Sequence, residues 1–193
     1  MLLVAAPVLA GFIDTGALER PWPKQWTHTY EVGKYPIAWR QRASRQEGIF
    51  ASARFVAPSS LERTWTLATD YTDLGRMTPG VSAVTILEET PTRRVIQIDM
   101  KVLWKTIRLV FEIEQEPPKA VRFRLVNRFV GDYRGVCLMR PEGSGTAVEL
   151  ATWLQPAVRV PKGLVLSVER MLVLKGVREF LKTCESTPAP ATA

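Results

Sequence analysis

The sequence predicts an α+β fold in which a curved antiparallel sheet of about six to seven strands wraps around a long C-terminal helix, with two short helices after the first strand. Apolar and polar residues alternate in successive segments after residue 80, and turn residues separate these segments. The last apolar segment instead follows helical spacing. An antiparallel sheet with one polar face buries only its other face, and this helix is long enough to cover it.

The first strand is predicted at 49–56, where small or apolar residues alternate with polar ones. Ser59 or Ser60 then caps a helix, because a hydroxyl accepts a hydrogen bond from a free N–H group of the first turn. Asp70 opens a second helical segment at 71–77 for the same reason. Both helices therefore precede the main run of strands.

The remaining strands each have one apolar and one polar face. They are predicted around 84–86, 96–104, 107–113, 121–125, 132–139 and 146–155. Turn-forming residues occupy 89–92, 116–119 and 141–145. Because these connections are short, neighbouring strands are expected to pair as hairpins.

The C-terminal helix is predicted from Pro161 to Cys184. One apolar stripe is expected to face the sheet, has Arg170 inside it, and consists of Leu166, Val173, Val177, Phe180 and Leu181. A second stripe lies roughly opposite and consists of Leu164, Val168, Met171 and Leu172. If exposed, the second stripe marks a partner, a membrane or a pocket gate; alternatively, the helix twists so that both stripes are buried.

One domain is predicted at 48–185, preceded by two N-terminal segments and followed by a tail. Residues 1–20 are signal-like or disordered: their apolar run of about 13 positions is too short for a membrane span. Small residues near Ala10 suit a signal peptidase, although no Lys or Arg precedes the run. We expect an exported protein, periplasmic or membrane-associated, with a cytoplasmic protein as the alternative. Residues 186–193 form a Pro/Ala tail that is expected to be disordered.

Residues 21–47 form a basic, Trp-containing N-terminal arm. The chain has a net charge of +7, and 20–54 holds seven basic residues against two acidic ones. This excess suits peripheral contact with an anionic membrane, with Trp22, Trp26 and Trp39 as interface anchors. The alternatives are an ordinary solvated face and an arm that packs across the sheet. Nucleic acid is not an expected partner, because the basic residues do not interleave with aromatic residues on a sheet face.

The residue counts argue against most familiar catalytic sites. Cys137 and Cys184 are too few for a zinc site or a disulfide framework, although they could form one bridge or remain buried thiols. The single histidine, His28, argues against a Ser-His-Asp arrangement. The sequence also has no Gly-rich phosphate loop. We therefore assign no metal ligand, no cofactor and no catalytic residue.

Short motifs in a particular order nevertheless resemble a known family. They are Ala57-Pro58-Ser59 through Trp65, Asp70-Tyr71-Thr72-Asp73, Pro79-Gly80-Val81, Gly131-Asp132-Tyr133-Arg134-Gly135, Gly145-Thr146, and Pro156 with Pro161. Together they resemble the START-like (SRPBCC) superfamily of polyketide cyclase/dehydrase and coenzyme Q-binding proteins. The resemblance covers roughly residues 48–184. Cys137 departs from it, because in the family Trp is commoner than Cys in the strand after the Gly-Asp motif.

The resemblance implies a helix-grip fold with a cavity for a lipophilic molecule, such as a quinone, sterol, fatty acyl chain or polyketide. Members of the superfamily range from lipid carriers to cyclases, so the fold alone does not choose a reaction. We expect this chain to bind or transport a hydrophobic small molecule between sheet and helix. The alternative is a cyclase/dehydratase-type enzyme that acts on a polyketide or terpenoid-like substrate.

The candidate ligand-binding residues lie on the apolar face of the predicted sheet and helices. They are Trp65, Ile98, Met100, Phe111, Phe123, Tyr133, Arg170, Val173 and Val177. Arg170 either anchors a polar group of the ligand, pairs with Asp99 or Glu149, or is exposed. Tyr133 donates a hydrogen bond at the pocket mouth, or its Gly-Asp neighbours only serve the turn. In the enzyme alternative, Tyr133, Arg170 or Glu149 supplies the acid/base chemistry.

Overall fold

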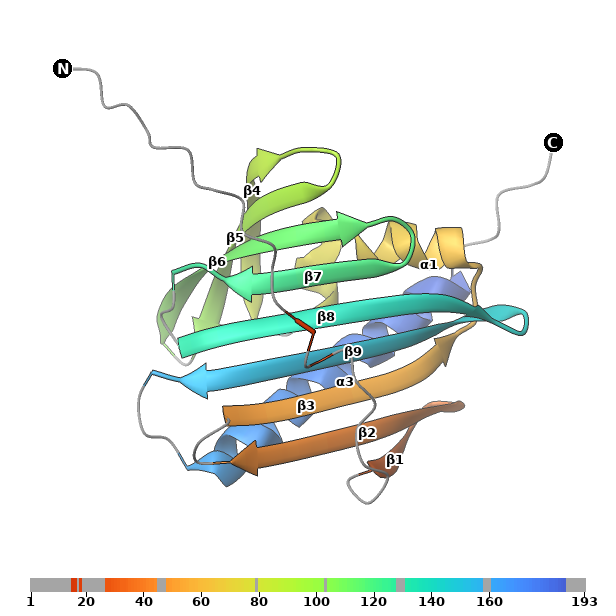
Figure 1. The fold of residues 1–193 in the computed structure, drawn as a ribbon, viewed down its shortest axis with the longest axis horizontal. Coiled ribbons are helices and arrows are strands. Elements are labelled where there is room, and N and C mark those ends of the chain that lie inside the picture. Colours follow the sequence, from red (N-terminus) through yellow and green to blue (C-terminus); the bar gives the residue numbers. More distant parts are fainter. Residues whose placement is uncertain are drawn as a thin grey trace.

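The structure is a computed structural model that describes residues 15, 16, 18, 27–44, 48–78, 80–102, 104–127, 131–157 and 161–186. In these ranges the chain forms one antiparallel sheet of nine strands in the order β1-β2-β3-β9-β8-β7-β6-β5-β4 (Figure 1). The strands are β1 Thr27–Val32, β2 Tyr35–Ser44, β3 Gly48–Ala57, β4 Val81–Glu89, β5 Arg93–Val102, β6 Lys105–Glu116, β7 Ala120–Leu125, β8 Gly131–Glu142 and β9 Gly145–Pro156.

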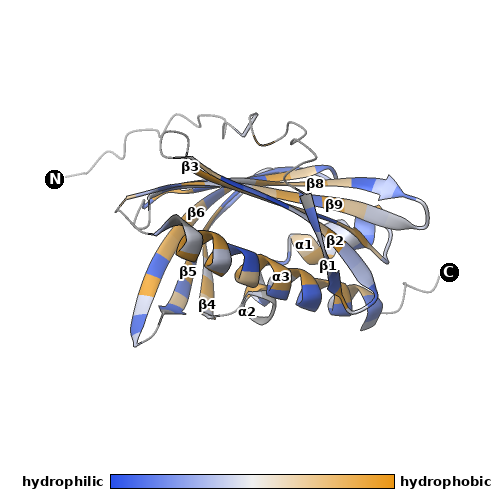
Figure 2. Ribbon diagram, turned by 90° about the horizontal axis from the view of Figure 1, so that it is seen from below, coloured by the Kyte–Doolittle hydropathy of each residue, from blue (hydrophilic) through white to orange (hydrophobic). Residues whose placement is uncertain are grey.

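Helices enter the chain at two points. After β3 come α1 (Leu61–Ala68), the 3-10 helix η2 (Tyr71–Asp73) and α2 (Leu74–Met77), and after β9 comes α3 (Lys162–Ser186). The first three carry the chain from β3 to the far edge strand β4, and the chain then returns strand by strand until β9 pairs with β3. The sheet curves over α3, which lies against its concave face (Figure 2). The predicted fold class, with its long C-terminal helix, is confirmed.

The sheet has two more strands than the six to seven predicted, and both come from the predicted N-terminal arm. β1 and β2 form a hairpin, and β2 pairs with β3. Trp39 on β2 is only 1% exposed and belongs to the core. A buried side chain cannot anchor the chain in a membrane interface, so the prediction of a membrane-interface anchor is wrong for Trp39. Trp22 and Trp26 lie outside the described residues.

The two short helices begin where the sequence predicts. Ser60 caps α1, since its Oγ accepts a hydrogen bond from the backbone N–H of Arg63 at 3.3 Å. The Asp70 carboxylate accepts one from the N–H of Thr72 at 3.2 Å and caps η2. These caps direct the chain away from β3 and towards the far edge of the sheet.

Apolar side chains pack on both faces of the sheet. On the concave face they join the C-terminal half of α3, where the rings of Phe55 and Phe180 meet edge to face with centroids 6.1 Å apart. On the outer face, Leu18 packs with Val136 and Ala151. Part of the predicted signal-like segment 1–20 is thus in contact with the domain. The predictions of a signal-like N-terminus and a disordered C-terminal tail apply mainly to residues 1–14 and 187–193. Both segments lie outside the described residues.

The two stripes of α3 differ in burial. Val177, Phe180 and Leu181 of the first stripe are buried. Leu164, Val168 and Met171 of the second stripe are exposed, so a twist that buries both stripes is wrong. Among the helices of the described part, none has the combination of length and hydropathy needed to cross a membrane.

Candidate functional site

The concave face carries a cluster of three aromatic residues beside α3. Phe111 on β6, Phe123 on β7 and Tyr133 on β8 have ring centroids 6.0–6.3 Å apart. Both phenylalanines pack against the core, yet all three side chains are only half-buried. They therefore form an apolar surface on the concave side of the sheet that the rest of the chain covers only in part.

The N-terminal half of α3 is covered less completely than its C-terminal half. The backbone of α3 packs mainly against β3, β2, α1 and α2, and its most buried side chains all follow residue 176. Leu166, Glu169 and Val173, in the N-terminal half, are only half-buried. The side chains of α3 are therefore buried in the core at its C-terminal end and only partly covered at its N-terminal end.

A glycine makes room for the aromatic cluster. Phe123 pairs with Gly135 across β7 and β8. A Cβ atom at Gly135 would lie 2.1 Å from Cζ of Phe123, so the ring lies over the glycine backbone. The Gly-Asp-Tyr-Arg-Gly motif thus has two separate parts, one that places Tyr133 in the cluster and one that accommodates Phe123.

One acidic side chain faces this apolar surface. The Thr152 hydroxyl on β9 donates a short hydrogen bond to Oε1 of Glu169 on α3. Burial raises the pKa of Glu169, and the Thr152 hydrogen bond opposes this only in part. Burial, and then the charge of Glu169, raise the pKa of Tyr133 on the neighbouring strand. Glu169, Thr152 and Tyr133 thus form the polar group of the site.

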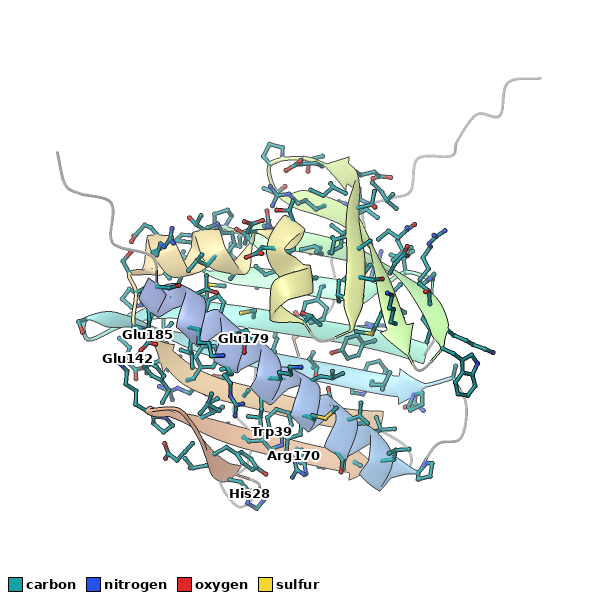
Figure 3. The ribbon with its side chains drawn as sticks, turned by 180° about the vertical axis from the view of Figure 1, so that it is seen from behind. His28, Trp39, Glu142, Arg170, Glu179 and Glu185 are labelled. Carbon is teal, nitrogen blue, oxygen red and sulfur yellow. The ribbon has the colours of Figure 1, made fainter. Side chains whose placement is uncertain are left out.

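Sequence reasoning missed Glu169 and selected its neighbour. Glu169 follows Leu166 by three residues and precedes Val173 by four, so it belongs to the sheet-facing stripe as much as Arg170 does. Arg170 instead turns to β1, where its Nη1 donates to the Tyr30 hydroxyl at 3.1 Å and its guanidinium lies over the Tyr30 ring. Figure 3 shows Arg170 on the side of α3 that faces β2.

The other partners considered for Arg170 are wrong. Asp99 accepts a hydrogen bond from Arg108 at 3.0 Å. On β9 the side chain of Glu149 points to the outer face of the sheet, whereas those of Val148 and Thr152 point to the concave face. Glu149 lines a groove on the outer face. Glu149 therefore cannot supply acid/base chemistry to the interior.

Most of the other candidate residues belong to, or pack against, the same core as the cluster. Ile98 and Met100 share the concave face of β5, next to the β6 row that contains Phe111. Val177 and Ile98 are buried in the core, while Trp65 and Val173 are half-buried against it. Of the nine candidates, Phe111, Phe123 and Tyr133 touch one another directly.

Two other hollows lie outside this interior. One of about 490 Å³ is lined by Leu61, Arg54 and Glu149, among others, and one of about 480 Å³ lies between the β1–β2 turn and the end of α3. Arg54 in the first is paired with Glu142 at 2.9 Å, and Lys34 in the second is paired with Glu185 at 2.8 Å. The lining of each is more apolar than polar, but ion-paired charged side chains lie among the apolar ones in both hollows.

The interior has further titratable groups that stay neutral. Burial raises the pKa of Cys137 to about 12 and that of Tyr71 to about 12. The Tyr71 hydroxyl also accepts a hydrogen bond from the Gln115 side chain at 2.8 Å. Cys137 and Cys184 are not bridged to each other. Within the described ranges, no group of three or more His, Cys, Asp and Glu side chains could hold a metal ion.

Comparison with known proteins shows which family the fold and sequence match. The sequence model of the family "Polyketide cyclase / dehydrase and lipid transport" matches residues 58–181. A search of curated protein sequences gave no significant match.

Solved structures share the fold at low sequence identity. A STAR-related lipid transfer protein from Xanthomonas axonopodis has 13% identity and a TM-score of 0.70 over 83% of this chain and 99% of its own. Human StAR-related lipid transfer protein 5 has 12% identity and a TM-score of 0.65 over 84% and 88%. The Zhui aromatase/cyclase from Streptomyces has 14% identity and a TM-score of 0.63 over 70% and 93%.

Proposed function

The chain belongs to the polyketide cyclase/dehydrase and lipid transport family, and we propose that it binds and carries a hydrophobic small molecule between the sheet and the N-terminal half of α3. The observation that supports this most is the half-buried aromatic cluster of Phe111, Phe123 and Tyr133 on the concave face. Large apolar side chains in an interior are normally covered. Here a bound apolar molecule would complete their burial.

Burial of apolar surface would supply the binding energy. A ligand that buries about 400 Å² of apolar surface gains about 10 kcal/mol at 25 cal/mol per Å². Association costs several kcal/mol in lost translational and rotational freedom. A net gain of about 6 kcal/mol or less remains, so we expect affinities of tens of micromolar or weaker that depend on chain length, with Glu169, Thr152 and Tyr133 orienting the ligand.

Native mass spectrometry tests this proposal. Protein purified from a lipid-containing bacterial host is expected to carry a noncovalent lipophile, which organic extraction and mass analysis then identify. The extracted protein should bind a fluorescent hydrocarbon such as diphenylhexatriene with one site per chain. Protein that carries nothing and binds no hydrocarbon would contradict the proposal.

One observation favours an enzyme as the second candidate. Glu169 is a buried carboxyl group with a raised pKa, and such a group can protonate a carbonyl oxygen during cyclisation or dehydration. Tyr133 lies beside it as a second hydroxyl donor. Turnover of a polyketide substrate that is lost in Glu169→Gln and reduced in Tyr133→Phe, with hydrocarbon binding unchanged, would support catalysis. Binding without turnover supports a carrier.

We further propose that membrane contact uses the exposed stripe of α3. Leu164, Val168 and Met171 face away from the sheet. The basic residues Arg42 and Arg54 alternate with inward-facing residues of β2 and β3 and therefore lie on the opposite, outer face. One flat membrane cannot touch both surfaces. Liposome co-sedimentation should fall in Met171→Glu and stay unchanged in Arg42→Glu; the reverse pattern would favour the basic surface.

A further inference from the structure

The carboxyl group of Glu169 has one satisfied and one unsatisfied oxygen. Oε1 accepts the hydrogen bond from Thr152. Oε2 is shielded from solvent and has no hydrogen-bond partner among the described residues. A buried polar atom without a partner is rare and costs free energy. An oxygen in this position therefore needs a partner that the described side chains do not supply.

The side chains that face Glu169 in the described part of the chain supply no positive charge to keep it ionised. On β8 the titratable side chains of the concave face are Tyr133 and Cys137, both of which stay neutral because burial raises their pKa. β9 contributes the uncharged Thr152, and β3 presents alanines and Phe55. Arg170, next along α3, is engaged with Tyr30. These surroundings favour the protonated, neutral carboxyl group.

We propose that Glu169 anchors the head group of the ligand by donating a hydrogen bond from Oε2 to its oxygen atom. The inference rests on the proposed function, since it assumes a ligand in the same interior space. Thr152 holds Oε1 as acceptor, which leaves the proton on Oε2. Because Oε2 is covered by its neighbours, a ligand oxygen reaches it only after these side chains shift, so ligand binding must include that shift.

The proposal predicts a class of ligand. A ketone, ester or alcohol oxygen accepts the hydrogen bond without adding charge to the interior. A fatty-acid carboxylate would place a second acid beside Glu169, and two neighbouring carboxylates cannot both ionise in an apolar site. The site is therefore selective for uncharged lipophiles that carry an oxygen atom, against both plain hydrocarbons and fatty-acid anions.

A matched set of ligands and variants tests the anchor. Dodecane, 2-dodecanone and dodecanoate are compared by their displacement of diphenylhexatriene from the wild type, Glu169→Gln and Glu169→Leu. One hydrogen bond is worth about tenfold in affinity, so the wild type should prefer the ketone over the hydrocarbon by about that factor. Glu169→Gln keeps an N–H donor and should keep the preference, whereas Glu169→Leu should lose it while it still binds the hydrocarbon.

The pH dependence adds a second readout. The ketone preference of the wild type should fall as the pH rises through the pKa of Glu169, because the ionised form has no proton to donate. Glu169→Gln should show no such change. A preference retained in Glu169→Leu, or lost in Glu169→Gln, overturns the anchor. Failure of the wild type to bind diphenylhexatriene would instead overturn the proposed function.

Discussion

The ring of Phe123 occupies the space that a side chain at Gly135 would need, across the pair of β7 and β8. This contact links a glycine of the chain's most recognisable motif to the aromatic cluster of the candidate site. Since Tyr133 lies two residues before Gly135 and its ring is 6.0 Å from that of Phe123, the position of one ring depends on the other.

Gly135→Ala should therefore destabilise the fold and weaken binding together. The new methyl group forces Phe123 out of its position, and overpacking of this kind costs about 1–3 kcal/mol. Urea unfolding measures the loss, and diphenylhexatriene titration measures the affinity. Gly163→Ala is the matched control, because its Cβ on α3 would meet no atom within 4 Å beyond its chain neighbours and the local helix backbone. It should be neutral or slightly stabilising, and equal losses in both variants would contradict this explanation.

Glu112 should make the fold sensitive to acid. Burial alone would raise the pKa of Glu112. Hydrogen bonds from Arg93 and Arg124 outweigh this effect and lower the pKa of Glu112 below its ordinary value. A lowered pKa in the folded state means that stability falls as the pH drops below about 4.3, the value in an unfolded chain. Glu112→Gln should cost about 1–3 kcal/mol at pH 7 and flatten this fall. If stability falls with acid in Glu112→Gln as it does in the wild type, the ion pairs of Glu112 do not cause the acid sensitivity.

Glu169 should affect the pH dependence of stability in the opposite direction to Glu112. Its pKa is raised in the folded protein, so folding favours the protonated form. The free energy of unfolding should therefore decrease as the pH rises from about 4.3 to the folded pKa of Glu169. Glu169→Gln keeps an acceptor for Thr152 and removes the charge, so it should raise stability at neutral pH. Denaturant midpoints measured from pH 4 to 8 check this, and a less stable Gln variant at pH 7 would contradict it.

Arg170 and Tyr30 should be energetically coupled. The hydrogen bond and the cation–π contact between them predict a coupling free energy of about 0.5–2 kcal/mol in a double-mutant cycle with Arg170→Met and Tyr30→Leu, which removes both the hydroxyl and the ring. Hydrocarbon affinity should change little in either variant if the role of Arg170 is structural. A large loss of affinity in Arg170→Met with no coupling to Tyr30 would instead restore Arg170 as a ligand anchor.

Both thiols should be unreactive in the native state. Burial raises the pKa of Cys137 to about 12 and also raises that of Cys184. At pH 8 a disulfide reagent should label neither residue until denaturant unfolds the chain. Rapid labelling of one thiol in native buffer would show that the interior opens around it.

Local patterns in the sequence predict most of the fold, because strand alternation and helical spacing depend on neighbouring residues. The hairpin of β1 and β2 was missed for a physical reason. Its alternation is interrupted by Pro36 and by charged residues, and Ile37 and Trp39 reveal their buried face only once β2 pairs with β3. The turn at Gly33, with φ of +63°, was the signal that could have identified it.

The candidate site was predictable only in part. The apolar face of the strands follows from their alternation, so Phe111, Phe123 and Tyr133 were selected. Glu169 and Arg170 are adjacent on α3 and differ by about 100° in direction. The rotation of α3 decides which of them faces the sheet, and that rotation depends on packing at its far end around Phe180. Spacing along the sequence does not contain this information.

The site of ligand contact tests the central claim most directly. A hydrocarbon with an aliphatic diazirine is bound and photoactivated, and the modified residues are mapped by peptide mass spectrometry. Labels should fall on β6, β7 and β8 around Phe111, Phe123 and Tyr133, and on α3 near Val173, and excess 2-dodecanone should suppress them. Labels confined to the outer stripe of Leu164, Val168 and Met171, or none above the level of a denatured control, would contradict an interior binding site.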